Sequence, residues 1–144
     1  MDERQLIEKL RRVEALFEGA GTTTGEREAA ACALDRLRRR LDEAQERDPV
    51  IEYRFTLADM WSRRLFVALL RRYGIHPYRY SGQRYTTVMA RVPRQFVDET
   101  LWPEYTELNE VLRTYLEETT ERVIRQGVHE DSSEAEVMKA LPGA

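Results

Sequence analysis

The sequence is poor in the residues that most often build catalytic and metal sites, with one cysteine and two histidines among 144 residues. A lone cysteine excludes an internal disulfide bond, and a zinc site needs several convergent histidine, cysteine or carboxylate ligands. His129 and Glu130 begin the zinc-protease motif H-E-x-x-H, but Ser133 stands where the second histidine would have to be. No serine or cysteine has a local nucleophile signature with histidine and acid. We therefore expect no catalytic residues, no metal site and no cofactor.

Long apolar runs are also missing. No stretch approaches the roughly 18 apolar residues that span a bilayer, and the first residues lack the basic and apolar regions of a signal peptide. Apolar residues still make up 42% of the chain, which is enough for a core and argues against wholesale disorder. We expect a soluble, cytoplasmic protein with no membrane partner.

The middle of the chain has little negative charge. Residues 54–94 hold nine arginines against Asp59 alone, a balance of +8, whereas residues 1–53 sum to −3 and residues 95–144 to −8. A basic middle followed by an acidic end has two interpretations. The basic element is either an open surface for acidic partners or is neutralised by the protein's own C-terminal helix.

Hydrophobic spacing and turn residues predict an α+β fold that is mostly helical. Two amphipathic helices, about 3–20 and 25–46, form an N-terminal helical hairpin. A helix from Thr56 to Gly74 leads into a small antiparallel sheet, and a long helix over 94–126 follows. The expected organisation is a hairpin over 1–48, a small α/β unit over 49–128 packed with it as one domain, and an acidic flexible tail over 129–144.

Two details of this arrangement follow from local patterns. The sheet is predicted as a β-hairpin, 75–80 and 84–92 around a Ser-Gly-Gln turn, with 50–55 as a third strand. For the preceding helix, Thr56 is the predicted N-cap and Gly74 the stop. Its spacing places Trp61 and Ala68, together with two leucines, on the core side.

Two stretches resemble domain-of-unknown-function family 2786, which occurs in bacteria and phages. One is K-L-R-R-V-E-A-L-F-E-G-A with the following G-E-R-E-A-A-A-C-A-L-D-R-L-R-R-R-L, where Glu28, Ala29, Ala33 and Leu37 lie near family positions. The other is W-S-R-R-L-F-V-A-L-L-R-R-Y-G-I-H-P-Y-R-Y, similar to a helix that leads to a hairpin. The resemblance implies a helical hairpin with a small α/β unit and a bacterial or phage origin. It implies no catalytic residues.

The long C-terminal helix has two interpretations. Its apolar positions from Leu101 to Thr119 recur at heptad-like spacings, but over fewer than three repeats. A coiled coil needs the pattern to last for three to four heptads, which favours packing on the protein's own sheet. Homo-oligomerisation through the 101–119 helix is the alternative.

The stretch R-R-Y-G-I-H-P-Y-R-Y-S-G-Q-R-Y, residues 71–85, interleaves arginine with tyrosine. These residue types clamp phosphates and stack on bases, and they are also common in protein interfaces. The candidate binding residues on this stretch and its flanks are Arg64, Arg71, Arg72, Tyr78, Arg79, Tyr80, Arg84, Tyr85 and Arg91.

The sequence therefore predicts a non-enzymatic binding or accessory protein. The first hypothesis is a protein-interaction or self-assembly module, and the alternative is a nucleic-acid-binding protein that uses the Arg/Tyr-rich hairpin. No small-molecule substrate is indicated.

Overall fold

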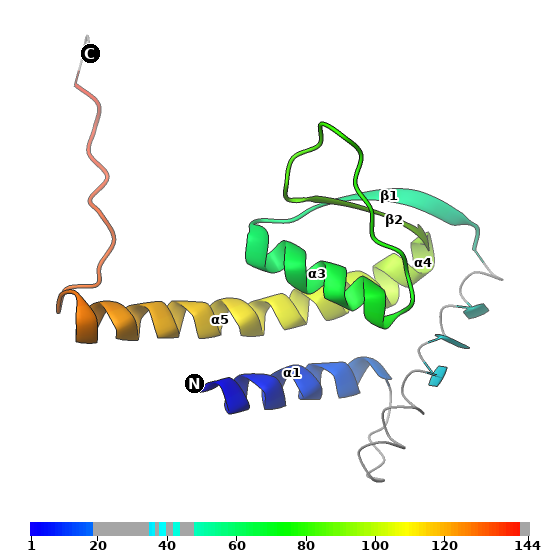
Figure 1. Cartoon of the computed structure of the whole chain (residues 1–144), viewed down its shortest axis with the longest axis horizontal. Coiled ribbons are helices and arrows are strands. Elements are labelled where there is room, and N and C mark those ends of the chain that lie inside the picture. Colours follow the sequence, from blue (N-terminus) through cyan, green and yellow to red (C-terminus); the bar gives the residue numbers. More distant parts are fainter. Residues whose placement is uncertain (19–34, 37, 40–41, 44–47, 142–144) are drawn as a thin grey trace.

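The computed structural model describes residues 1–18, 35–36, 38–39, 42–43 and 48–141. It confirms the mixed fold class and the long C-terminal helix (Figure 1). The predicted second helix of the N-terminal hairpin, 25–46, lies for the most part outside the described residues. The elements are α1 Glu3–Glu18, β1 Val50–Thr56, α3 Met60–Arg72, β2 Thr87–Pro93, α4 Arg94–Phe96, the π-helical turn η1 Val97–Leu101 and α5 Trp102–Gly127.

The described elements stack in layers, with the sheet on one side, α3 and α5 beneath it, and α1 along α5 (Figure 1). The N-terminal amino group lies 3.3 Å from the Glu118 carboxylate. At the other end of α1, Glu14 reaches Arg72, which is paired with Glu104 near the start of α5. Helices α1 and α5 are therefore antiparallel, and the C-terminal turns of α5 extend past the N-terminus of α1 (Figure 1).

The sheet has two described strands. β1 pairs with β2 in antiparallel register, from Val50 opposite Pro93 to Thr56 opposite Thr87. Alternation places Phe55, Val88 and Ala90 on the inner face, where they join the core. The predicted third strand is thus confirmed, and it pairs directly with β2.

The first arm of the predicted hairpin is not a strand. Residues 75–80 contribute one isolated bridge, between Tyr78 and Met89, and the chain then turns at Gly82, which has a positive φ of 85°. Tyr78 directs its own N–H to Met89, so the nitrogen of Pro77 faces away from β2, where no ladder donor is needed and a proline is tolerated.

Helix α3 begins later than expected, because Thr56 belongs to β1. Its N-cap is Asp59, whose carboxylate accepts a 2.8 Å hydrogen bond from the Ser62 N–H. The helix ends at Arg72, and Gly74, the predicted stop, follows the C-cap residue Tyr73 with a φ of 74°.

The predicted core side of α3 is wrong at two positions. Trp61 is 48% exposed, and Ala68 is also exposed. The buried face includes Ser62 and Phe66 in their place. Hydrophobicity alone makes Trp61 a better candidate for burial than Ser62. The serine can be buried because its hydroxyl donates a 2.8 Å hydrogen bond to the side chain of Asn109.

From Arg94 the chain runs through α4 and η1 into α5 without a break. Leu101, Tyr105 and Leu108 are buried against the body, with Tyr105 in edge contact with Phe66 at 5.1 Å. Beyond Val111, α5 has no buried side chain. Residues 129–141 form no helix or strand. None of the helices in the described part of the chain combines the length and apolar character needed to cross a membrane.

We predict that Asp59→Ala destabilises the fold by about 1 kcal/mol, because it removes the side-chain acceptor at the start of α3. Asp59→Asn is the matched control, since asparagine caps helices as well as aspartate does. Urea unfolding followed by circular dichroism measures both. Equal losses for the two variants would contradict the role of the cap.

Candidate functional site

The structure places the nine candidate residues in three regions. Arg64 and Arg71 lie on the exposed side of α3, and Arg72 lies at the junction of α1, α3 and α5. The other six lie on the 75–86 loop and on β2.

The loop and the sheet share a surface that we call the outer face. Opposite residues of an antiparallel pair point to the same side, and Glu52 lies opposite Arg91 while Arg54 lies opposite Met89. Tyr78 lies opposite Met89 on the other edge of β2. These side chains therefore point away from the inner face that packs on the helices.

An aromatic ledge, defined as His76, Tyr78 and Tyr80, occupies this outer face. The rings of His76 and Tyr78 stack with centroids 6.0 Å apart, and Tyr80 meets Tyr78 edge-on at 5.7 Å. Both tyrosine hydroxyls donate to the same oxygen of Glu52, Oε2, each at 2.5 Å. Glu52 therefore ties the loop to β1 across the intervening strand.

This shared carboxylate changes the acidity of all three groups. The hydrogen bonds from Tyr78 and Tyr80 hold the pKa of Glu52 below its usual value. In return, the bond to Glu52 raises the pKa of Tyr78 to about 12 and also raises the pKa of Tyr80. Both tyrosines are thus neutral donors throughout the physiological pH range.

Arg79 and Tyr85 are engaged within the loop itself. The guanidinium of Arg79 donates to the carbonyls of Thr87, Gln83 and Arg84 at 3.1, 3.0 and 2.6 Å. It also lies 5.6 Å from the centre of the Tyr85 ring, and Arg63 of α3 lies 4.4 Å from the same centre. These two candidates hold the loop in shape.

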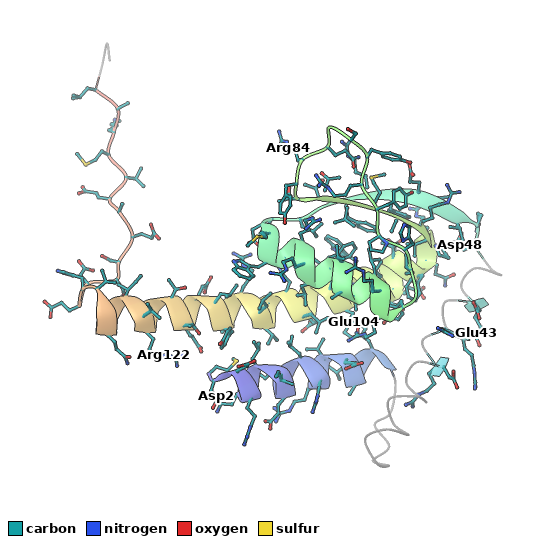
Figure 2. The ribbon with its side chains drawn as sticks, in the orientation of Figure 1. Asp2, Glu43, Asp48, Arg84, Glu104 and Arg122 are labelled. Carbon is teal, nitrogen blue, oxygen red and sulfur yellow. The ribbon has the colours of Figure 1, made fainter. Side chains whose placement is uncertain are left out.

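Arg72 is partly buried and lies at the junction of three helices. It donates to Glu104 and lies 3.5 Å from Glu14, while the Tyr73 hydroxyl donates to the second oxygen of Glu104. Glu104 is 0% exposed, and Figure 2 shows it between α5 and α1. A buried carboxylate needs such compensation, so this cluster joins three helices.

The remaining candidate arginines, and Arg54 of β1, have no acidic partner among the described residues. In the described part of the chain, Glu104 of α5 forms an ion pair with Arg72, and Asp98 of η1 forms one with Arg94. No described carboxylate lies within 4.0 Å of the guanidinium of Arg54, Arg64, Arg71, Arg84 or Arg91. Arg84 extends from the loop away from the body (Figure 2). Among the described residues, the acidic C-terminal helix therefore leaves the loop and β2 arginines unneutralised.

Three residues of the outer face, namely Glu52, Arg54 and His76, were not among the candidates predicted from the sequence. The sequence does contain a signal for two of them, because alternation along the strand places Glu52 and Arg54 on the outer face when Tyr53 and Phe55 face the core. The contact between Glu52 and the ledge could not be predicted without the order of the strands in the sheet. Within the described ranges, no three histidine, cysteine or acidic side chains gather as metal ligands.

No family model, curated protein or solved structure matches the chain. The resemblance to family 2786 therefore stays an expectation, and a functional assignment depends on the geometry of the outer face.

We predict that Glu104→Ala lowers the free energy of unfolding by about 3 kcal/mol, because it leaves Arg72 and the Tyr73 hydroxyl without their shared acceptor. Glu107→Ala, one turn later on the exposed side of α5, is expected to stay within about 0.5 kcal/mol. Chemical denaturation measures the difference. Similar values for the two variants would show that the cluster does not stabilise the fold.

We predict that Glu52→Gln lowers the pKa of Tyr78 from about 12 towards its ordinary value of 10.0, since the neutral amide no longer favours the protonated phenol. NMR titration of ring-labelled tyrosine follows this residue. In the unmodified protein, the bonds from Tyr78 and Tyr80 favour the ionised form of Glu52 and so lower its pKa. They are therefore expected to weaken when the pH falls through that lowered pKa and Glu52 is protonated. An unchanged Tyr78 titration in the variant would rule out this coupling.

Proposed function

We propose that this chain is a non-enzymatic binding protein that contacts an acidic segment of another protein through its outer face. The observation that carries this proposal is the combination of Arg84 and Arg91, which have no acidic partner among the described residues, with an aromatic ledge held in place by Glu52. Tyrosine and arginine are enriched at the energetically important centres of protein interfaces.

The aromatic ledge favours a protein partner over a nucleic acid. Its tyrosines are held in place by Glu52 and by their ring–ring contacts, which leave little ring face for a base to stack on. One side of the Tyr78 ring is stacked on His76, so that ring is not freely available to a base. Tyr80 is 52% exposed and offers an amphipathic surface to a protein side chain.

Nucleic-acid binding is the second candidate, and the five arginines that have no acidic partner among the described residues favour it. Phosphate binding of this kind makes affinity fall steeply with salt concentration, and removing one arginine that binds a phosphate reduces the salt slope by about one. Salt dependence therefore separates the two candidates when it is measured on defined probes.

The test compares Arg84→Ala/Arg91→Ala with the charge-matched control Arg4→Ala/Arg12→Ala, whose arginines are exposed on α1. Fluorescence anisotropy is measured at two salt concentrations with three labelled probes. These are a glutamate-rich peptide containing aromatic residues, a single-stranded DNA and a single-stranded RNA.

We expect the unmodified protein and the control to bind the peptide, and the Arg84/Arg91 variant to bind it about tenfold more weakly, a loss of about 1.4 kcal/mol. Preferential binding of an oligonucleotide, with a salt slope that falls by about two in the variant, would replace the first candidate with the second. No binding of any probe at low salt would contradict both.

A further inference from the structure

The edge of β1 that faces away from β2 has backbone groups that no described residue pairs with. Tyr78 and Met89 exchange both backbone hydrogen bonds, at 3.0 and 2.8 Å, so the N–H and C=O of Met89 point away from β1. Arg54 lies directly opposite Met89 and must therefore direct its own N–H and C=O away from β2. Ladder alternation gives the same outward direction to Glu52 and Thr56. No strand in the described part of the chain pairs with these groups.

This edge lacks most of the features that normally prevent strand addition, and its two charged residues, Glu52 and Arg54, have opposite signs. Residues 50–56 contain no proline or lysine, and their register with β2 is unbroken by a bulge. The inward-facing residues Ile51, Tyr53 and Phe55 carry no charge. Monomeric proteins usually protect a long edge with one of these devices. The open edge of β1 is therefore suited to a further strand.

Apolar surface borders the same edge. Ile51 is 43% exposed although it lies on the inner face. Trp102, which stacks on Phe55 at 6.0 Å, is 39% exposed. A strand added beside β1 would cover part of this surface.

The charges on β1 are complementary to those of a second β1 strand that runs antiparallel to it, because Glu52 and Arg54 flank Tyr53 symmetrically. We propose that β1 pairs antiparallel with β1 of a second copy of this chain, with Tyr53 opposite Tyr53 at the two-fold axis. This is the alignment that uses all seven residues of the strand. It places Glu52 of each copy opposite Arg54 of the other, twice by symmetry.

The backbone pattern fits the same alignment. In an antiparallel pair, residues whose N–H and C=O point towards the partner strand lie opposite each other. Glu52 and Arg54 both have outward groups, so they form hydrogen-bonded pairs, whereas the central Tyr53 residues form a non-hydrogen-bonded pair. Centring on Glu52 or on Arg54 instead would place like charges opposite each other, which destabilises pairing.

The side chains also have free capacity for this pairing. Both tyrosines donate to Oε2 of Glu52, and Oε1 receives no hydrogen bond from the described residues. Arg54 has no acidic partner among the described residues of its own chain. The guanidinium of the second copy's Arg54 would supply the missing donor. The two strand pairs then form a four-stranded sheet whose outer faces lie on the same side.

This self-association does not depend on the proposed binding of an acidic protein, and it uses β1 and not the 101–119 helix. Sedimentation equilibrium over a concentration series tests it. The unmodified chain is expected to reach twice its mass of 17.0 kDa. Arg54→Glu and Glu52→Arg are each expected to remain monomeric, because like charges then face each other. The control Arg4→Glu, on the exposed side of α1, keeps the dimer.

Mixing the two single variants gives the decisive result. In the mixed pair, every arginine at 52 or 54 faces a glutamate, so an equimolar mixture of Arg54→Glu and Glu52→Arg is expected to regain the dimer mass. The double variant regains it for the same reason. This recovery also excludes unfolding as the cause of the single-variant loss.

Amide hydrogen exchange supplies an independent measurement. The outward amides of Glu52, Arg54 and Thr56 are expected to gain protection as protein concentration rises, while the amide of Phe55, already directed to β2, does not change. A chain that stays monomeric at every concentration would overturn the proposal. So would a dimer that survives Arg54→Glu, since it would use another surface, or a variant mixture that stays monomeric.

Discussion

The described fold depends on the fully buried carboxylate of Glu104. It accepts hydrogen bonds from Arg72 and Tyr73, and Arg72 also reaches Glu14, so one ionic cluster joins α1, α3 and α5. Burying such a charge is costly unless donors surround it, and an incomplete set would be worse than apolar packing. The cluster therefore fixes how the three helices align. The inner face of the sheet packs on these helices, with Phe55 of β1 in contact with Phe66 of α3.

The outer face is shaped by side chains more than by regular secondary structure. The 75–86 loop has a single bridge to β2, and its conformation depends on Glu52 holding two tyrosines and on Arg79 bonding three carbonyls. These contacts restrict the ledge in the unbound chain, which would reduce the entropy lost in the proposed binding. Arg84 and Arg91 would then meet a partner without first breaking an ion pair to another described residue.

Periodicity and turn chemistry were sufficient to predict most of the described elements. Alternation identified β1, and the glycine at position 74 marked the end of α3, because both are local properties. Contacts between distant segments could not be predicted. The pairing of Glu52 with residues 26 and 28 positions later depends on strand order. Likewise, Arg72 and Arg71 are indistinguishable in sequence until α5 places Glu104 beside one of them.

The π-helical turn Val97–Leu101 sets how the chain tolerates changes in length. Buried positions there recur every four residues, from Phe96 through Thr100 to Glu104, which exceeds the α-helical repeat of 3.6 and suits a wider turn. Each residue of an α-helix advances the side chains by about 100°. A deletion of one residue here would return the turn to α-helical geometry and keep α5 in phase, whereas an insertion would rotate α5 by about that angle and carry the Glu104 carboxylate away from Arg72. The turn is therefore expected to tolerate shortening better than lengthening.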